Sequence, residues 1–81
     1  MFYIYVLQSI KDNKLYIGST SNLKNRFKEH NEGKVKSTSY RRPLELIYYE
    51  AYKEEEIARK REKILKSGKA HTELKRRLSI D

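Results

Sequence analysis

The stretch YIYVLQSIKDNKLYIGSTSNLKNRFKEH, residues 3–30, carries the pattern that decides the fold. It begins inside the segment Phe2–Ser9, where apolar or aromatic residues occupy both alternating faces, as in a strand buried on both sides. The Asp-Asn pair that follows is a turn signal. The next segment, LYIGS at residues 15–19, is typical of a returning strand. We therefore predict a hairpin that brings Tyr5 close to Tyr16.

The residues after this hairpin predict a short amphipathic helix. Ser21 is the expected N-cap, and a glycine twelve residues later in the chain ends the helix. At about 100° per residue, Leu23 and Phe27 form its apolar line. His30 lies beside that line and Arg26 one step further round. Both side chains are therefore expected to face the sheet or its rim.

The rest of the chain predicts one more strand and two more helices. A basic loop, Lys34–Arg42, leads into the strand LELIYYEAY at residues 44–52. Residues 53–68 predict a helix with acids in its first turn and bases near its end, a charge order that suits the helix dipole. Residues 71–80 predict a final helix with Thr72 as its N-cap. The expected fold is α+β, a small three-stranded antiparallel sheet flanked by helices in the order β-β-α-β-α-α.

Composition limits the domain organisation and excludes several function classes. Eighty-one residues without a linker or an internal repeat predict one small domain spanning residues 1–81. Cysteine is absent, which excludes disulfides and cysteine zinc sites. No apolar run approaches about 18 residues, so no membrane span and no membrane partner are expected. The N-terminus lacks the features of a secretion signal, so we expect a cytoplasmic protein.

The charge predicts a polyanionic partner. Nineteen Lys and Arg against eleven Asp and Glu leave a net charge of +8, which is typical of a protein that binds the phosphate backbone of nucleic acid. A basic protein without such a partner is the alternative. The candidate backbone contacts, expected to give salt-dependent and sequence-tolerant binding, are Lys34, Lys36, Arg41, Arg42, Lys66 and Lys69.

Four short motifs, in order along the chain, resemble those of the GIY-YIG nuclease superfamily. They are Tyr3–Tyr5, Tyr16–Gly18, Arg26 with His30, and the Ala-x-x-x-Glu segment at residues 58–62. The resemblance covers nearly the whole chain. It is strongest to the small stand-alone bacterial members, and extends to the N-terminal nuclease domain of the excision-repair subunit UvrC. It implies a metal-dependent endonuclease that hydrolyses phosphodiester bonds of DNA. The form of that DNA, branched, flapped or general, and the pathway, repair or recombination among them, stay open at the level of sequence.

The resemblance also implies a catalytic set. Glu62 corresponds to the single carboxylate that holds one divalent metal, Mg²⁺ or Mn²⁺. Tyr5 corresponds to the general base, and Tyr16 to a residue that positions the water or the metal's ligands; the residues themselves leave these two roles interchangeable. A free tyrosine has a pKa of about 10, so a cation must lower it for this task. Arg26 corresponds to the contact with the scissile phosphate. His30 orients a tyrosine or donates to phosphate.

Plain structural roles compete with these assignments. Glu62 can pair with Lys66 four residues later on the same helix. Arg61 falls within the apolar arc of its helix, which we interpret as a snorkelling or phosphate-facing side chain. Five tyrosines are expected to pack the core: Tyr3, Tyr40, Tyr48, Tyr49 and Tyr52.

Two further functions stay open at the level of sequence. One is a non-catalytic nucleic-acid binding module on the same fold, and the other is a protein-interaction domain for an acidic partner. Many GIY-YIG relatives carry an asparagine after their glutamate, and none follows Glu62 here. The chain also has no room for an appended targeting domain. We therefore expect activity that is weak or depends on a protein partner.

Overall fold

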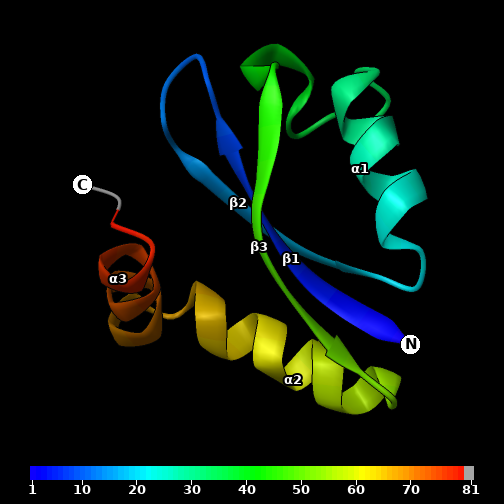
Figure 1. Ribbon diagram of the computed structural model, residues 1–81, viewed down its shortest axis with the longest axis vertical. Coiled ribbons are helices and arrows are strands. Elements are labelled where there is room, and N and C mark those ends of the chain that lie inside the picture. The colour runs from blue at the N-terminus through cyan, green and yellow to red at the C-terminus, as the bar shows by residue number, and fades with distance from the viewer. Residues whose placement is uncertain (80–81) are drawn as a thin grey trace.

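The computed structural model describes residues 1–79 and contains one three-stranded antiparallel sheet (Figure 1). Strands β1 (Phe2–Ser9), β2 (Leu15–Thr20) and β3 (Leu44–Tyr52) are arranged in the order β2-β1-β3. β1 is therefore the central strand. This position explains its apolar residues on both faces, since four consecutive residues from Ile4 to Leu7 are at most 1% exposed. The predicted strand, buried on both sides, is confirmed.

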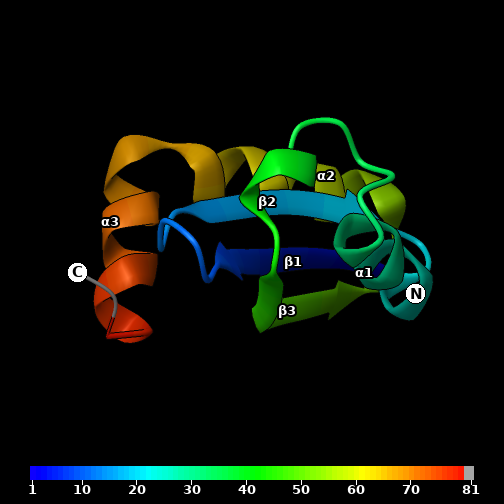
Figure 2. The same ribbon diagram turned by 90° about the horizontal axis from the view of Figure 1, so that it is seen from above.

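Helices cover both faces of the sheet. α1 (Leu23–Asn31) lies on one face, whereas α2 (Glu55–Lys66) and α3 (Gly68–Arg77) lie on the other (Figures 1 and 2). A short 3₁₀ helix at Ser39–Arg41 interrupts the basic loop before β3. The α+β class and the order β-β-α-β-α-α are confirmed. No helix within residues 1–79 is both long enough and apolar enough to cross a membrane.

Alternation along β1 divides the core into two parts. Ile4 and Val6 face α2 and α3, where they pack with Ala58, Leu65 and Leu74. Tyr5 and Leu7 face α1 on the opposite side, where they pack with Leu44 and with the half-buried Leu23 and Phe27. Burial of these apolar side chains is the main force that holds the three helices on the sheet. Tyr5 thus belongs to the core and to the candidate catalytic set at once.

Two helix boundaries differ from the sequence prediction. The N-cap of α1 is Asn22 rather than Ser21, because its side-chain oxygen accepts a hydrogen bond from the Asn25 amide at 3.1 Å. Gly68 begins α3 instead of ending α2, since the extended Ser67 turns the chain between them. Thr72 therefore lies inside α3 and donates to the carbonyl of Gly68 at 2.8 Å. Residue 80, predicted at the end of this helix, is outside the described residues.

The tyrosine and arginine predictions for the core need correction. Tyr40 and Tyr49 are 70% and 54% exposed, so neither packs the core. Tyr48 and Tyr52 do pack against it, as predicted. Arg61 neither snorkels nor faces a phosphate, because its guanidinium donates two hydrogen bonds to the carboxylate of Glu50 on β3, at 2.9 and 3.1 Å.

Candidate active site

The glycine of the second tyrosine motif seats the tyrosine of the first. Tyr5 on β1 lies directly opposite Gly18 on β2. A Cβ atom added to Gly18 would lie 2.5 Å from the hydroxyl oxygen of Tyr5 and 3.1 Å from the ring of Tyr16. Any side chain at this position would therefore displace both rings. The close approach, rather than a special backbone angle, explains the glycine.

Three aromatic rings gather above this glycine, as the hairpin and helix predictions anticipated. The ring centroids of Tyr5 and Tyr16 are 6.2 Å apart, and that of His30 lies 5.6 Å from Tyr5 and 5.0 Å from Tyr16. His30 comes from the last turn of α1 and is fully buried. The structure thus joins the first three sequence motifs in one cluster on the α1 face.

A chain of hydrogen bonds runs through His30. The hydroxyl of Tyr5 lies 2.9 Å from Nε2 of His30, and Nδ1 lies 2.7 Å from the hydroxyl of Thr38. Thr38 donates its own proton to the carbonyl of Val35 at 3.4 Å. Its oxygen is then left to accept, so we assign the ring proton to Nδ1, which makes Nε2 the acceptor for Tyr5. Tyr5 therefore has a proton acceptor on the protein side of its hydroxyl.

Burial sets the protonation states of this pair. Desolvation lowers the pKa of His30 to about 4, with a smaller contribution from the positive charge of Arg26, so the ring is neutral at neutral pH. Desolvation raises the pKa of Tyr5 to about 12, although the nearby Arg26 acts in the opposite direction. The expected effect of Arg26 on Tyr5 is present, but burial outweighs it. Tyr5 is a neutral phenol in this state.

Arg26 lies at the rim of the cluster. Its guanidinium forms an ion pair with Glu29 at 3.2 Å, and its side chain is 38% exposed. The side chain therefore borders both the buried Tyr5 and the solvent. A partly exposed guanidinium in this position can receive a phosphate group without moving the helix.

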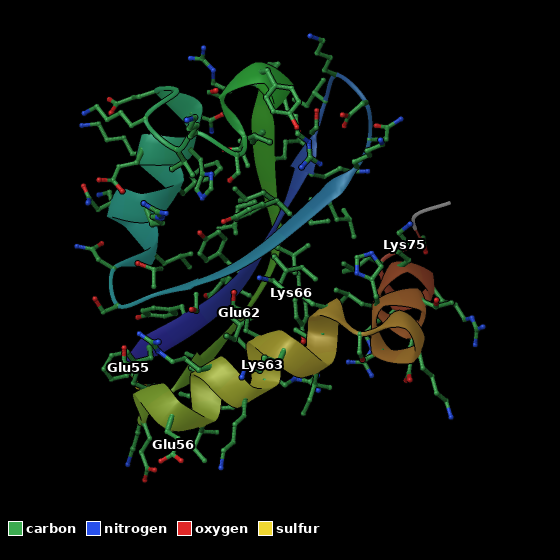
Figure 3. All side chains as sticks on the ribbon, turned by 180° about the vertical axis from the view of Figure 1, so that it is seen from behind. Glu55, Glu56, Glu62, Lys63, Lys66 and Lys75 are labelled. Carbon is green, nitrogen blue, oxygen red and sulfur yellow. The ribbon has the colours of Figure 1, made fainter. Side chains whose placement is uncertain are left out.

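Glu62 reaches the site from the other face of the sheet. It extends from α2 toward β2, with Lys66 beside it (Figure 3). Lys66 Nζ lies 2.9 Å from its carboxylate, so the competing ion pair expected from sequence is present. Burial alone would raise the pKa of Glu62, but Lys66 and the neighbouring Ser19 hold it below its ordinary value. The carboxylate is ionised, and its charge is felt at Tyr5.

The donor chemistry suits a hard divalent cation held by one carboxylate. Within residues 1–79 there is no group of three His, Cys, Asp or Glu side chains that could form a complete ligand set. Mg²⁺ commonly keeps several waters and is held by one or two carboxylates together with substrate phosphate. Glu62 has the right charge and is 20% exposed, so it fits this mode once Lys66 moves aside.

The six candidate backbone contacts differ in how free they are. Lys34, Lys36, Arg42, Lys66 and Lys69 are exposed, although Lys34 pairs with Glu32 and Lys66 with Glu62. Arg41 is only 13% exposed. Its guanidinium lies 3.6 Å from the carboxylate of Asp12 and donates to the carbonyl of Leu15 at 3.4 Å. Arg41 thus ties the basic loop to the β1–β2 turn.

Two residues near the site were missed in the sequence. Thr38 lies eight positions after His30, beyond a turn, so no helical spacing could link the two. The loop offers three consecutive hydroxyl residues, Ser37, Thr38 and Ser39, and nothing in the sequence distinguishes Thr38 among them. Ser19 directly follows the second motif, and its proximity to Glu62 depends on how α2 packs against β2.

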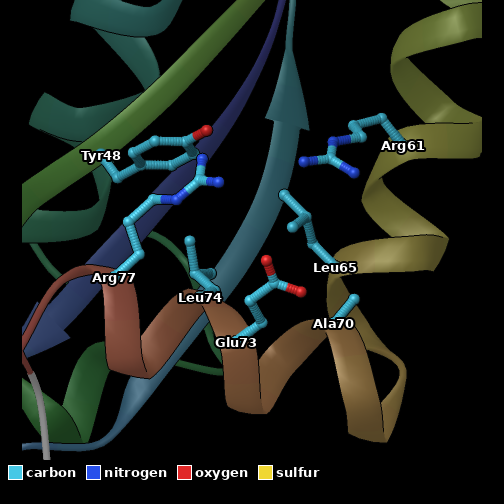
Figure 4. Close-up of a pocket in the computed structure, with 7 residues that line it drawn as sticks. All are labelled: Tyr48, Arg61, Leu65, Ala70, Glu73, Leu74 and Arg77. Atoms are coloured by element: carbon cyan, nitrogen blue, oxygen red, sulfur yellow. The ribbon is translucent and has the colours of Figure 1, made fainter.

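A cavity lies on the face of the sheet opposite α1, between β3, α2 and α3. It has a volume of about 140 Å³, and Tyr48, Arg61 and Arg77 border it (Figure 4). Arg61 is committed to Glu50, which also accepts hydrogen bonds from the hydroxyls of Tyr48 and Tyr52. Burial would raise the pKa of Glu50, but these partners lower it to about 2. This network holds α2 to β3.

Known proteins resemble this chain over most of its length. The model of the GIY-YIG catalytic domain matches residues 1–76. UPF0213 proteins of Streptococcus pyogenes serotypes M3 and M5 are 42% identical over 72 residues, which is 88% of this chain and 77% of theirs. The solution NMR structure of a UPF0213 protein from Bacillus halodurans is similar with a TM-score of 0.55 and 32% identity. The matched region covers 91% of this chain and 81% of the Bacillus halodurans protein.

Proposed function

The chain belongs to the GIY-YIG catalytic-domain family, and from this premise we propose that it is a divalent-metal-dependent endonuclease that hydrolyses phosphodiester bonds in DNA. The observation that carries the proposal is the buried hydrogen-bond chain from Tyr5 through His30 to Thr38. A buried phenol needs a hydrogen-bond partner in any case, but a neutral imidazole whose tautomer is fixed by Thr38 can also accept the proton of that phenol. The Tyr5 end of this hydrogen-bond chain lies beside Arg26 and within the electrostatic reach of Glu62, so a phosphate and a metal could both be bound close to Tyr5.

The tyrosine–histidine pair supplies the general base. A water oxygen attacks phosphorus while its proton passes to the hydroxyl of Tyr5, and the original proton of Tyr5 passes to Nε2 of His30. The bond that breaks joins phosphorus to the leaving sugar oxygen, which takes up a proton from solvent. Because a bound phosphodiester adds negative charge, it raises the pKa of His30 and helps the ring to hold the proton.

Glu62 and Arg26 supply the charge that the reaction needs. Glu62 would hold Mg²⁺ or Mn²⁺, whose role is to stabilise negative charge on the phosphate oxygens. Arg26 donates to the same phosphate from the α1 side, where its fixed cationic group favours the developing charge. Tyr16 keeps the ring of Tyr5 in place and orders the attacking water. The ion pair between Glu62 and Lys66 must open when metal and DNA bind.

The basic surface holds the DNA backbone. We propose that the exposed basic side chains contact phosphates of the DNA backbone. Arg41 instead fixes the loop that carries several of these side chains. The contacting set is Lys34, Lys36, Arg42, Lys66 and Lys69. Such contacts position DNA without reading its sequence. Choice of a target then depends on DNA shape, such as a flap or branch, or on a protein partner.

The test is cleavage of labelled single-stranded, duplex, flapped and branched DNA, with Mg²⁺ or Mn²⁺ compared with EDTA. We expect metal-dependent products that Glu62→Gln abolishes without loss of DNA binding. Glu56→Gln is the matched control, because Glu56 is an exposed acid on the same helix that pairs with Lys60.

The same experiment examines the competing binding module. The Glu62–Lys66 ion pair is the observation that favours it, since an unused carboxylate would settle into such a pair. Tight DNA binding with no product in either metal, and no effect of Tyr5→Phe on that binding, would reject the nuclease and select the binding module.

A further inference from the structure

A wide groove opens on the α1 face beside the catalytic tyrosine. It has a volume of about 500 Å³, and the side chains that line it come from β1, α1 and β3: Tyr3, Leu23, Lys24, Phe27, Leu46 and Tyr49. Tyr49 is the direct cross-strand partner of Tyr5, and Tyr3 lies two residues before Tyr5 on the same strand face. The groove therefore shares a wall with the active site.

Of the aromatic rings in this groove, Phe27 packs against the core, whereas those of Tyr3 and Tyr49 belong to neither core cluster. Tyr49 is 54% exposed, and its ring stands edge-to-face with that of Tyr3 at a centroid distance of 6.2 Å. The hydroxyls of Tyr48 and Tyr52, on the opposite face of β3, are by contrast bound to Glu50. An exposed tyrosine over an apolar floor of Leu23, Phe27 and Leu46 is a surface on which a flat apolar ring can stack.

The charge around the groove favours a polyanion. Among its lining residues are a lysine, Lys24, and no carboxylate. Arg26 follows on the same helix, one turn from Leu23, and borders the neighbouring active site. A ligand with a planar apolar ring and a negatively charged backbone could stack its ring on the tyrosines and place its backbone against Lys24 and Arg26. Nucleic acid has that chemistry.

We propose that this groove binds one unpaired nucleobase of the DNA strand to be cut, next to the scissile phosphate. The inference rests on the proposed function and narrows its substrate class to DNA with a single-stranded segment at the cleavage position. A base within a duplex is stacked and paired, and cannot enter the groove without leaving the helix. Tyr3 and Tyr5 lie two strand residues apart, roughly 7 Å, which is near the spacing of successive phosphates in an extended strand.

The experiment measures stacking directly and without cleavage. A forked DNA carries 2-aminopurine in its single-stranded arm next to the junction, and its fluorescence and binding are followed in EDTA. We expect the wild-type protein to quench the probe and Tyr49→Ala to bind the fork about tenfold more weakly, with the quenching lost. Tyr49→Phe keeps the ring and retains both. Tyr40→Ala, which removes a still more exposed tyrosine outside the groove, leaves both unchanged.

A change in the DNA alone provides the second arm. With the wild-type protein, an abasic residue in place of the probed nucleotide should weaken fork binding by the same factor, whereas an abasic residue far out on the arm should not. Equal binding of both DNAs, or quenching that survives Tyr49→Ala, would overturn this inference. If metal-dependent cleavage is nevertheless observed, the proposed function stands alone. Absence of DNA binding by the wild-type protein would overturn both.

Discussion

His30 is fully buried, and each of its ring nitrogens has one partner, Tyr5 on one side and Thr38 on the other. A neutral imidazole can exist in two tautomers, and only the one with its proton on Nδ1 offers Nε2 as an acceptor. Thr38 selects that tautomer, because its hydroxyl donates a hydrogen bond to the carbonyl of Val35 and can therefore only accept one from His30. At the residue scale, Thr38 therefore sets which nitrogen of His30 faces the hydroxyl of Tyr5, and in the proposed reaction it would act on Tyr5 only through His30.

Replacement of Thr38 tests this control. Thr38→Val keeps the shape of the side chain but leaves the Nδ1 proton of His30 without an acceptor. We expect the free energy of unfolding to fall by about 1–3 kcal/mol, and cleavage to fall while the KM for DNA is kept. Thr38→Ser should restore most of both. The ¹⁵N chemical shifts of the His30 ring report the tautomer, and an unchanged tautomer in Thr38→Val would contradict the assignment.

The buried state of His30 also predicts how stability depends on pH. Its pKa is lowered from 6.5 to about 4 by burial, so the unfolded chain takes up a proton below pH 6.5 that the folded protein does not. The free energy of unfolding should therefore fall as the pH is lowered from 6.5 to 4.5, by roughly 2 kcal/mol. Urea unfolding at both pH values measures this.

The lower limit of that window separates His30 from the carboxylates. The pKa of Glu50 is lowered from 4.5 to about 2, so stability that depends on Glu50 is lost only as the pH falls below 4.5. His30→Gln should show little change in stability between pH 6.5 and 4.5. The same slope in this variant as in the wild type would assign the effect to another group.

At the scale of elements, we expect replacement of two glycines by alanine to change the free energy of unfolding in opposite directions. Gly18→Ala places a methyl group 2.5 Å from the Tyr5 hydroxyl inside the hairpin, so we expect a loss of about 1–3 kcal/mol in unfolding free energy and a loss of cleavage. Gly68→Ala adds a methyl group with nothing within 4 Å at the start of α3. It should gain up to about 1 kcal/mol, because alanine loses less conformational freedom in a helix.

Thermal or urea unfolding of the two variants, with cleavage assays alongside, checks this pair. A destabilised Gly68→Ala would show that the start of α3 requires glycine for a reason other than space. A Gly18→Ala variant with wild-type activity would show that the Tyr5 ring can move without cost to the site.

The same elements show how far sequence alone could reach. Strand β1, the hairpin and the apolar line of α1 follow from local periodicity, which is why the cluster of Tyr5, Tyr16 and His30 could be predicted. The start of α3 could not, because Ser67 and Gly68 carry the signature of a helix end as well as of a tight junction. Nor could the pairing of Arg61 with Glu50 or the contact of His30 with Thr38, because both depend on side chains from segments outside the local pattern.

At the scale of the whole molecule, the candidate active site lies at the β2 edge of the sheet. Tyr5, Tyr16 and Arg26 lie on the α1 face. Glu62 extends from α2, on the other face, toward the edge strand β2 (Figure 3). There Ser19 helps to lower its pKa. A phosphate at this edge can be reached from both faces, which neither face could achieve alone. The groove lined by Tyr3 and Tyr49 continues the same α1 face.

The net charge of +8 predicts a steep dependence of DNA affinity on salt, because each contacted phosphate releases counterions. In a plot of log affinity against log salt concentration for duplex DNA, Lys36→Gln should reduce the slope by about 0.9, the loss of one phosphate contact. Lys60→Gln removes the same charge from an exposed lysine on α2 that pairs with Glu56. It should lower affinity slightly and leave the slope unchanged. Equal slope changes in both variants would mean that DNA senses only the total charge, and that no defined path for the backbone leads across the basic loop to the sheet edge.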